Sequence, residues 1–174
     1  VPDGVGGLSR REFLRYCTGV ALTLGLAPVA GLRIAEAAGN PARRPSVIWL
    51  HGQECTGPTE TLLRAEHPRL ERLILDMISL DYHETLAAAA GHQVEAAKRA
   101  AMEANAGKYL LVVEGSVPTK DGGIYCKIAN KPVLQHVQEA AEHAAAIVAF
   151  GSCAAWGGVQ SAGDLPEHRV AAVV

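Results

Sequence analysis

From residue 46 to residue 152, short apolar segments alternate with longer segments of helix-forming composition. Strands that are apolar throughout are buried on both faces, and strands that alternate with helices are typical of a parallel sheet. The pattern therefore predicts an α/β fold, a doubly wound parallel sheet with helices on both faces. The expected strands are residues 46–52, 77–83, 109–115 and 146–152, and the expected helices are residues 60–68, 84–106 and 132–145.

Single residues set the expected ends of these helices. Thr59 or Thr61 can cap the first helix, since a hydroxyl accepts a hydrogen bond from a free backbone amide. The second helix is rich in alanine, and Gly91 is expected to interrupt it and Gly107 to end it. Pro132 suits the first turn of the third helix, because it has no amide hydrogen to leave unpaired.

The first 38 residues differ in character from the rest of the chain. Arg10 and Arg11 form a twin-arginine pair, a mildly apolar stretch follows at about residues 16–32, and AEAAG then offers a cleavage site of the A-x-A type. This order is typical of a bacterial twin-arginine export signal. We therefore expect residues 1–38 to be a signal peptide, residues 39–45 to be a linker, and the mature protein to be periplasmic.

The alternative for this segment is a short amphipathic or membrane helix. Its apolar run is interrupted by threonine, glycine and proline, which makes it a poor membrane span. The twin-arginine route carries proteins that are already folded, often with a cofactor installed. A cofactor-bearing domain over residues 46–174 is therefore the leading expectation.

Four cysteines are present, and two of them follow predicted strands. Cys55 lies just after the first strand and Cys153 just after the last, each in a glycine-rich turn. Because ligands bind at the carboxyl ends of parallel strands, we expect both thiols at the same edge as iron–sulfur ligands. The alternative is that both are ordinary buried thiols. Cys126 is expected to be structural, and Cys17 falls in the export signal.

Other chemistry has weaker support in the sequence. The histidines His51, His83, His92 and His136 show no zinc-binding spacing, so we expect surface or packing roles for them. Glu54 and Glu60 flank Cys55, where they can relay protons or simply begin a helix. No nucleophile elbow or phosphate-binding loop is present, and a net charge of −2 gives no basic footprint for nucleic acid. The long, turn-rich loop 114–125 is expected to be functional.

Four long stretches follow the expected export signal, in this order along the chain: VIWLHGQECTGPTETLLRAEHP, LILDMISLDYHETLAAAAGHQ, LLVVEGSVPTKDGGIYCKI and AIVAFGSCAAWGGVQSA. Together they resemble the small subunit of periplasmic nickel–iron hydrogenases over about residues 46–162. The resemblance implies that residues 46–174 are the truncated amino-terminal, flavodoxin-like domain of such a subunit. It also implies an oxidoreductase that is active only with a large subunit bearing the nickel–iron site, with a membrane cytochrome as a further partner of the complex.

The resemblance further implies a proximal 4Fe–4S cluster that relays electrons from dihydrogen oxidation at the large subunit. Cys55 matches the first ligand and Cys153 the third, whereas Pro58 stands where the family motif C-T-G-C-x-E has the second cysteine. The fourth ligand and the remaining clusters belong to a later part of the family sequence. No residue of this chain is implied to be catalytic.

Pro58 leaves two functions open. One is an electron-transfer subunit of a hydrogenase, and the other is a cluster-free remnant that only binds a partner or has no function. A flavin-binding carrier is disfavoured, because no phosphate-cradling loop follows the first strand. Since proline offers no ligating atom, we expect this chain alone not to hold a stable 4Fe–4S cluster.

Overall fold

The structure is a computed structural model that describes residues 11–12, 14–15, 18–19 and 44–161. Most of the expected export signal and linker, including Arg10 and Cys17, lies outside the described residues. Arg11 is described as helical and exposed. Within the described part of the chain, no helix is long and apolar enough to cross a membrane.

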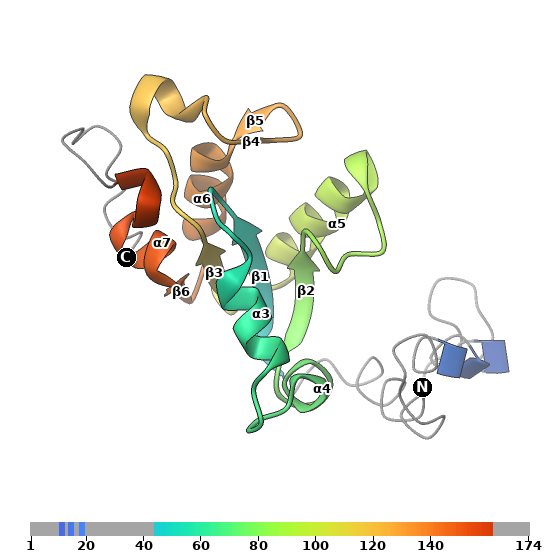
Figure 1. Cartoon of the computed structure of the whole chain (residues 1–174). Helices are drawn as coiled ribbons and strands as arrows, with labels where there is room; N and C mark the ends of the chain where they lie inside the picture. Colours follow the sequence, from blue (N-terminus) through green and yellow to red (C-terminus); the bar gives the residue numbers. More distant parts are fainter. Residues whose placement is uncertain (1–10, 13, 16–17, 20–43, 162–174) are drawn as a thin grey trace. The chain divides into compact units, whose positions relative to one another are not determined.

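Four strands form the central sheet, in the spatial order β2-β1-β3-β6 (Figure 1). They are β1 (Ser46–His51), β2 (Ser79–His83), β3 (Leu110–Glu114) and β6 (Ala146–Phe150). β3 is parallel to both β1 and β6. This order is the one in which a flavodoxin-like sheet begins, so the α/β prediction is confirmed.

The two faces of the sheet have different neighbours, because successive side chains of a strand point to opposite faces. Ile48 and Leu50 of β1 and their register partners Leu111 and Val113 of β3 lie on one face and are fully buried. They form the core with helices α5 (Gly91–Ala104) and α6 (Val133–Ala141). The helix residues of this core are Val94, Ala101, Met102, Val133, Leu134, Val137, Ala140 and Ala141.

The opposite face carries Trp49, His51 and Glu114, and helix α3 (Gly57–Leu63) is hydrogen-bonded to it through Thr59. Helices therefore lie on both faces, as predicted. The remaining elements are α4 (Leu70–Arg72), a π-helix (Leu73–Met77), 3-10 helices (Lys120–Gly123, Gly158–Ser161), the antiparallel hairpin β4 (Lys127–Ile128) and β5 (Lys131–Pro132), and α7 (Ser152–Trp156).

Two predicted helix starts were wrong. α3 begins at Gly57 rather than at a cap on Thr59 or Thr61, because Pro58 has a backbone suited to the first turn of a helix. Its preceding residue, Thr56, is left-handed, with φ 62°, and makes no side-chain cap. Gly91 begins α5 instead of interrupting a longer helix. The amides of Leu86 and Ala87 both bond the carbonyl of His83, which closes a turn there.

The chain divides into two compact units. One comprises Val1–Arg44 and Glu71–Ser79, and the other comprises Pro45–Leu70 and Leu80–Val174. Within the first unit, the guanidinium of Arg44 donates to the carbonyls of Leu75 at 3.0 Å and Ile78 at 3.3 Å. The domain boundaries expected from the sequence stay a prediction.

Candidate functional site

The segments that carry Cys55 and Cys153 lie side by side. Cys55 precedes α3, and Cys153 is the second residue of α7. The ring of Pro58, in the first turn of α3, lies directly against Gly151: a Cβ added to Gly151 would overlap Pro58 Cγ and lie 3.1 Å from Pro58 Cβ. Two segments almost one hundred residues apart in the sequence thus meet beside the carboxyl end of β6.

Both thiols face glycine. A Cβ at Gly57 would lie 3.1 Å from the sulfur of Cys55, and a Cβ at Gly158 would overlap the sulfur of Cys153. Cys55 is exposed and Cys153 is partly buried, and both are free thiols. Such glycine-lined turns leave room for backbone amides to approach a sulfur atom, which iron–sulfur clusters use.

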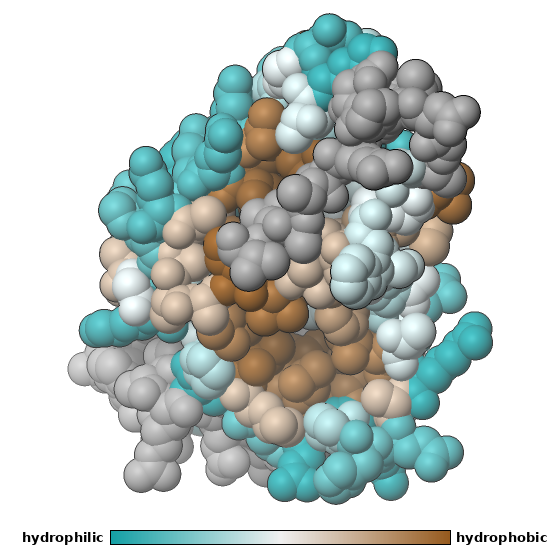
Figure 2. Space-filling view, turned by 90° about the vertical axis from the view of Figure 1, so that its left-hand side faces the viewer, coloured by the Kyte–Doolittle hydropathy of each residue, from teal (hydrophilic) through white to brown (hydrophobic). Residues whose placement is uncertain are grey.

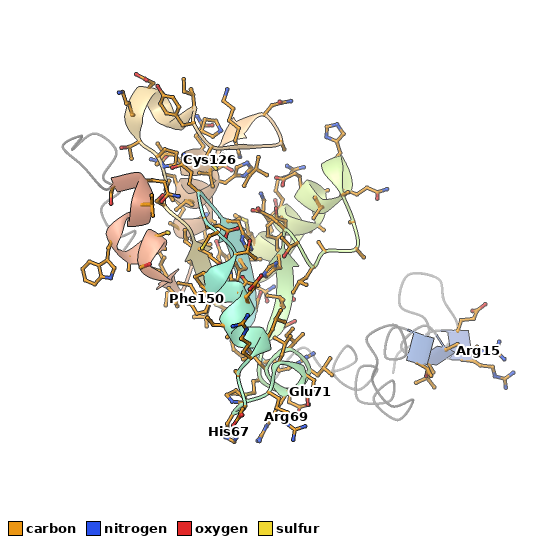
Figure 3. The ribbon with its side chains drawn as sticks, viewed as in Figure 1. Arg15, His67, Arg69, Glu71, Cys126 and Phe150 are labelled. Atoms are coloured by element: carbon orange, nitrogen blue, oxygen red, sulfur yellow. The ribbon has the colours of Figure 1, made fainter. Side chains whose placement is uncertain are left out.

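Cys126 occupies a different environment. It lies beside the β4–β5 hairpin, whereas Phe150 ends β6 (Figure 3). Its side chain packs against the core that α5 and α6 cover. Burial, followed by the charge of Glu84, raises the pKa of the Cys126 thiol. A neutral, packed thiol is a poor iron ligand, since the thiolate is the form that binds metals.

A 4Fe–4S cluster takes four thiolates in its usual form. Among the described residues, Cys55 and Cys153 are the cysteines on adjoining segments, and Pro58 supplies no donor atom between them. The described residues therefore supply two thiols on adjoining segments and do not complete the ligand set of such a cluster. The assignment of Cys55 and Cys153 as ligands stays a prediction.

Glu114 ties α3 to the sheet beneath it. Its side chain is fully buried, with 0% exposed. The carboxylate accepts hydrogen bonds from Trp49 Nε1 at 3.1 Å, from the backbone amide of Thr59 at 3.1 Å and from the Thr59 hydroxyl. This anchor was missed in the sequence, although a carboxylate at the end of an apolar strand, just before Gly115, was a usable signal.

Glu54 and His51 lie next to this anchor. Glu54 accepts hydrogen bonds from the amide and hydroxyl of Thr56 and lies 3.4 Å from His51 Nδ1. One ligand atom from each of His51, Glu54 and Glu114 lies within 4.8 Å of the others, the one such group of three among the described histidine, cysteine and acidic residues. Glu60, by contrast, is exposed on α3.

His51 and His83 form a buried aromatic cluster with Trp49. The two imidazole centroids are 4.6 Å apart, edge to face, and the rings of Trp49 and His83 are 5.1 Å apart. Burial, and then His51, lower the pKa of His83 to about 4, so this imidazole is neutral near pH 7. Burial also raises the pKa of Glu84, whose carboxylate accepts the His51 amide at 3.3 Å.

A second buried polar cluster links α5 and α6. Lys98, only 4% exposed, lies 2.7 Å from Glu95 and donates to His136 Nδ1 at 3.0 Å. His136 Nε2 donates to the carbonyl of Ile128 at 2.9 Å, which fixes the neutral tautomer. Burial and the charge of Lys98 lower the pKa of His136. His51, His83 and His136 are thus buried, while His92 is exposed.

The loop 114–125 passes beside the Cys55 segment. Gln53 and Ser116 form an isolated antiparallel bridge, and Gln53 Nε2 donates to the carbonyl of Tyr125 at 3.4 Å. Gly115 has a φ of +90°, and a Cβ there would lie 2.7 Å from Glu54 Cβ, so only glycine fits this close approach. Ile124 and Tyr125 are exposed on the loop.

The side of the molecule that carries β6 and α7 has an apolar surface (Figure 2). Val148 of β6, Trp156 of α7 and Val159 have exposed fractions of 41%, 80% and 85%. Large apolar side chains exposed together are typical of a contact surface.

Comparisons with known proteins agree on one family. A family model described as NADH ubiquinone oxidoreductase, 20 Kd subunit, matches residues 55–174. The Hydrogenase-2 small chain of Escherichia coli K12 is 54% identical over 164 residues, which are 94% of this chain and 44% of that one. The periplasmic NiFe hydrogenase small subunit 1 of Nitratidesulfovibrio vulgaris is 49% identical over 160 residues, which are 92% of this chain and 50% of that one.

A solved structure extends this likeness to three dimensions. The oxidized NiFeSe hydrogenase of Desulfovibrio vulgaris Hildenborough is 38% identical, with a TM-score of 0.68, over 74% of this chain and 47% of that one. The chain spans about half the length of the curated relatives that it matches. The chain belongs to the family described as NADH ubiquinone oxidoreductase, 20 Kd subunit, and its relatives there are hydrogenase small subunits.

Proposed function

We propose that the protein is the electron-transfer subunit of a nickel–iron uptake hydrogenase. It would relay electrons from dihydrogen oxidation at a large subunit through a proximal 4Fe–4S cluster. The observation that carries this proposal is the 54% identity to the Hydrogenase-2 small chain over 94% of the chain. The contact between the two cysteine segments at Pro58 and Gly151 supports it independently.

The residues of this chain have separate parts in that function. The thiolates of Cys55 and Cys153 hold iron, and Gly57 and Gly158 keep the space around their sulfurs free of side chains. Glu114 fixes α3, and with it the Cys55 turn, to the sheet. When bound, the cluster takes up and releases single electrons.

The partner is a large subunit that bears the nickel–iron site. Dihydrogen oxidation there yields two protons and two electrons, and a relay works only over short distances. The large subunit therefore docks on the side that carries the Cys55 and Cys153 turns. Loop 114–125, which contacts Gln53 beside Cys55, contributes to that interface.

The proposal includes delivery and location. Arg10 and Arg11 direct export by the twin-arginine route, and the mature complex is periplasmic. It associates with the membrane through its partners, with a membrane cytochrome as the electron acceptor.

Pro58 favours a second candidate, a cluster-free module that binds a partner without transferring electrons. A tagged full-length protein, co-produced with its large subunit, separates the two. The first function predicts recovery of the large subunit together with dihydrogen-dependent reduction of a viologen dye. Recovery of the large subunit with neither iron nor dye reduction supports the second function.

The same experiment tests the interface. Replacing residues 119–125 of this loop with a short Gly/Ser linker leaves the buried anchor Glu114 in place and should reduce recovery of the large subunit several-fold. The matched control replaces the exposed hairpin turn at Ala129 and Asn130 with two glycines. Undiminished recovery with the loop replaced removes the loop from the interface.

A further inference from the structure

We propose that residue 58 is a ligand position that this chain leaves empty, so that one iron bound beside Cys55 and Cys153 takes a small thiolate from solution. The inference rests on the proposed function, because it presupposes an iron–sulfur cluster at these turns. It concerns a different property, namely which protein atoms hold the iron.

The structure places residue 58 between the two cysteine segments. The Pro58 ring is in van der Waals contact with the backbone of Gly151, two residues before Cys153. Cys55 precedes Pro58 by three residues, and its sulfur lies beside Gly57. A side chain at position 58 therefore points at the Cys153 turn and not into solvent.

Proline at this position contributes carbon alone. Its nitrogen belongs to the backbone and carries no hydrogen, and its ring has no lone pair to offer. The backbone of the first helical turn is one that cysteine adopts without strain, and a cysteine side chain is smaller than the ring. Cysteine at position 58 would thus place a sulfur atom against Gly151, on the side of Cys153.

Several neighbouring polar groups already have hydrogen-bond partners. The hydroxyl and amide of Thr59 both bond Glu114, and Glu54 bonds Thr56 and contacts His51. Residues two apart on a helix do not face the same way, so Glu60 points away from the side of residue 58. Cys126 packs against the core. Among the described residues, His51 Nε2 and Gln160 Oε1 are buried without a hydrogen-bond partner, and neither is a thiolate.

The test compares four forms of the full-length protein, purified anaerobically with any large subunit that they retain: wild type, Pro58→Cys, Pro58→Ala and Glu60→Cys. Pro58→Ala removes the ring without adding a thiol. Glu60→Cys adds a thiol to the same helix on the exposed side. Iron loss is followed by visible absorption during challenge with a chelator, and 2-mercaptoethanol is titrated into each form.

Pro58→Cys should slow iron loss by about tenfold or more relative to the other three forms, because a protein thiolate replaces an exchangeable one. 2-Mercaptoethanol should shift the absorption and electron paramagnetic resonance spectra of wild type and leave Pro58→Cys unchanged. Iron found only in Pro58→Cys overturns the proposal, because wild type then holds no iron to which a thiolate from solution could bind.

Equal iron retention in wild type and Pro58→Cys overturns the proposal, as does iron that is absent from both. The proposed function fails separately, through loss of the large subunit or of dihydrogen-dependent dye reduction. A wild-type protein that reduces the dye but holds its iron as tightly as Pro58→Cys refutes the empty ligand position alone.

Discussion

The carboxylate of Glu114, at the end of β3, accepts a hydrogen bond from the backbone amide of Thr59 in α3 at 3.1 Å. Glu114 also accepts hydrogen bonds from Trp49 and from the Thr59 hydroxyl, and it is fully buried. A fully buried carboxylate with three donors holds the turn of Cys55 in place through the helix that follows it. The orientation of this turn thus depends on a residue nearly sixty positions away.

Glu114→Ala should lower the free energy of unfolding by about 3 kcal/mol, because three buried donors lose their acceptor. Urea unfolding of the full-length protein measures the change. Glu60→Ala, on the exposed side of the same helix, is the control and should stay within about 0.5 kcal/mol of wild type. Equal effects of the two substitutions would show that Glu114 is not an anchor.

Gly151→Ala should destabilise the protein by about 2–4 kcal/mol. Gly151 has a φ of +85° and a ψ of 167°, a region that other residues avoid, and a Cβ there would overlap the Pro58 ring. The cost should be smaller by about 1 kcal/mol or more in a Pro58→Ala background, where the ring is gone. Strictly additive effects in urea unfolding would place the two residues out of contact.

Stability should fall on acidification because of His83. Its pKa is about 4 in the folded protein and 6.5 when unfolded, so between these pH values the unfolded state binds more protons. The contribution is present above pH 6.5 and is lost as the pH falls towards 4. Between pH 7 and pH 5 the expected loss is about 2 kcal/mol.

His83→Gln should remove this part of the pH dependence, whereas His92→Gln, at an exposed position, should leave it unchanged. Urea unfolding at pH 7, 6 and 5 provides the comparison. If the free energy of unfolding of His83→Gln fell between pH 7 and pH 5 as much as that of wild type, the titration would belong to another group.

Export should depend on Arg10 and Arg11. Replacing both with lysine keeps the charge but changes the twin-arginine pair that the export machinery reads, so the protein should remain in the cytoplasm. Cell fractionation with detection of the tagged protein measures this. Replacement of Arg43 and Arg44 with lysine is the control, and periplasmic delivery of the Arg10/Arg11 variant would refute the export signal.

The fold was largely predictable, because strands that are buried on both faces have continuous apolar sequences. β1 and β3 fall within one or two residues of the runs that predicted them. The start of α3 was misplaced because side-chain capping was expected at Thr59 or Thr61, whereas the constraint came from the backbone of Pro58. Gly91 was read as a break, although a positive φ also suits the first residue after a turn.

The polar interior could not be predicted in the same way. Burial of Glu114 and the contact of Lys98 with His136 depend on partners from distant segments, and no local pattern encodes those pairs. The periodicity of α5 places Lys98 on the same face as Val94, Ala101 and Met102, but its charge alone would favour an exposed position. Cys55 and Cys153 were easier to place together, since both follow strands of one parallel sheet.

The central claim is that Cys55 and Cys153 belong to an electron relay served by dihydrogen. Its most direct measurement is electron paramagnetic resonance of the full-length protein, purified anaerobically with its large subunit, before and after exposure to dihydrogen. We expect dihydrogen to reduce the iron–sulfur cluster of wild type and thereby to change its spectrum. The double substitution Cys55→Ser and Cys153→Ser should abolish this change while the large subunit still co-purifies. An unchanged response to dihydrogen in the double variant would contradict the central claim.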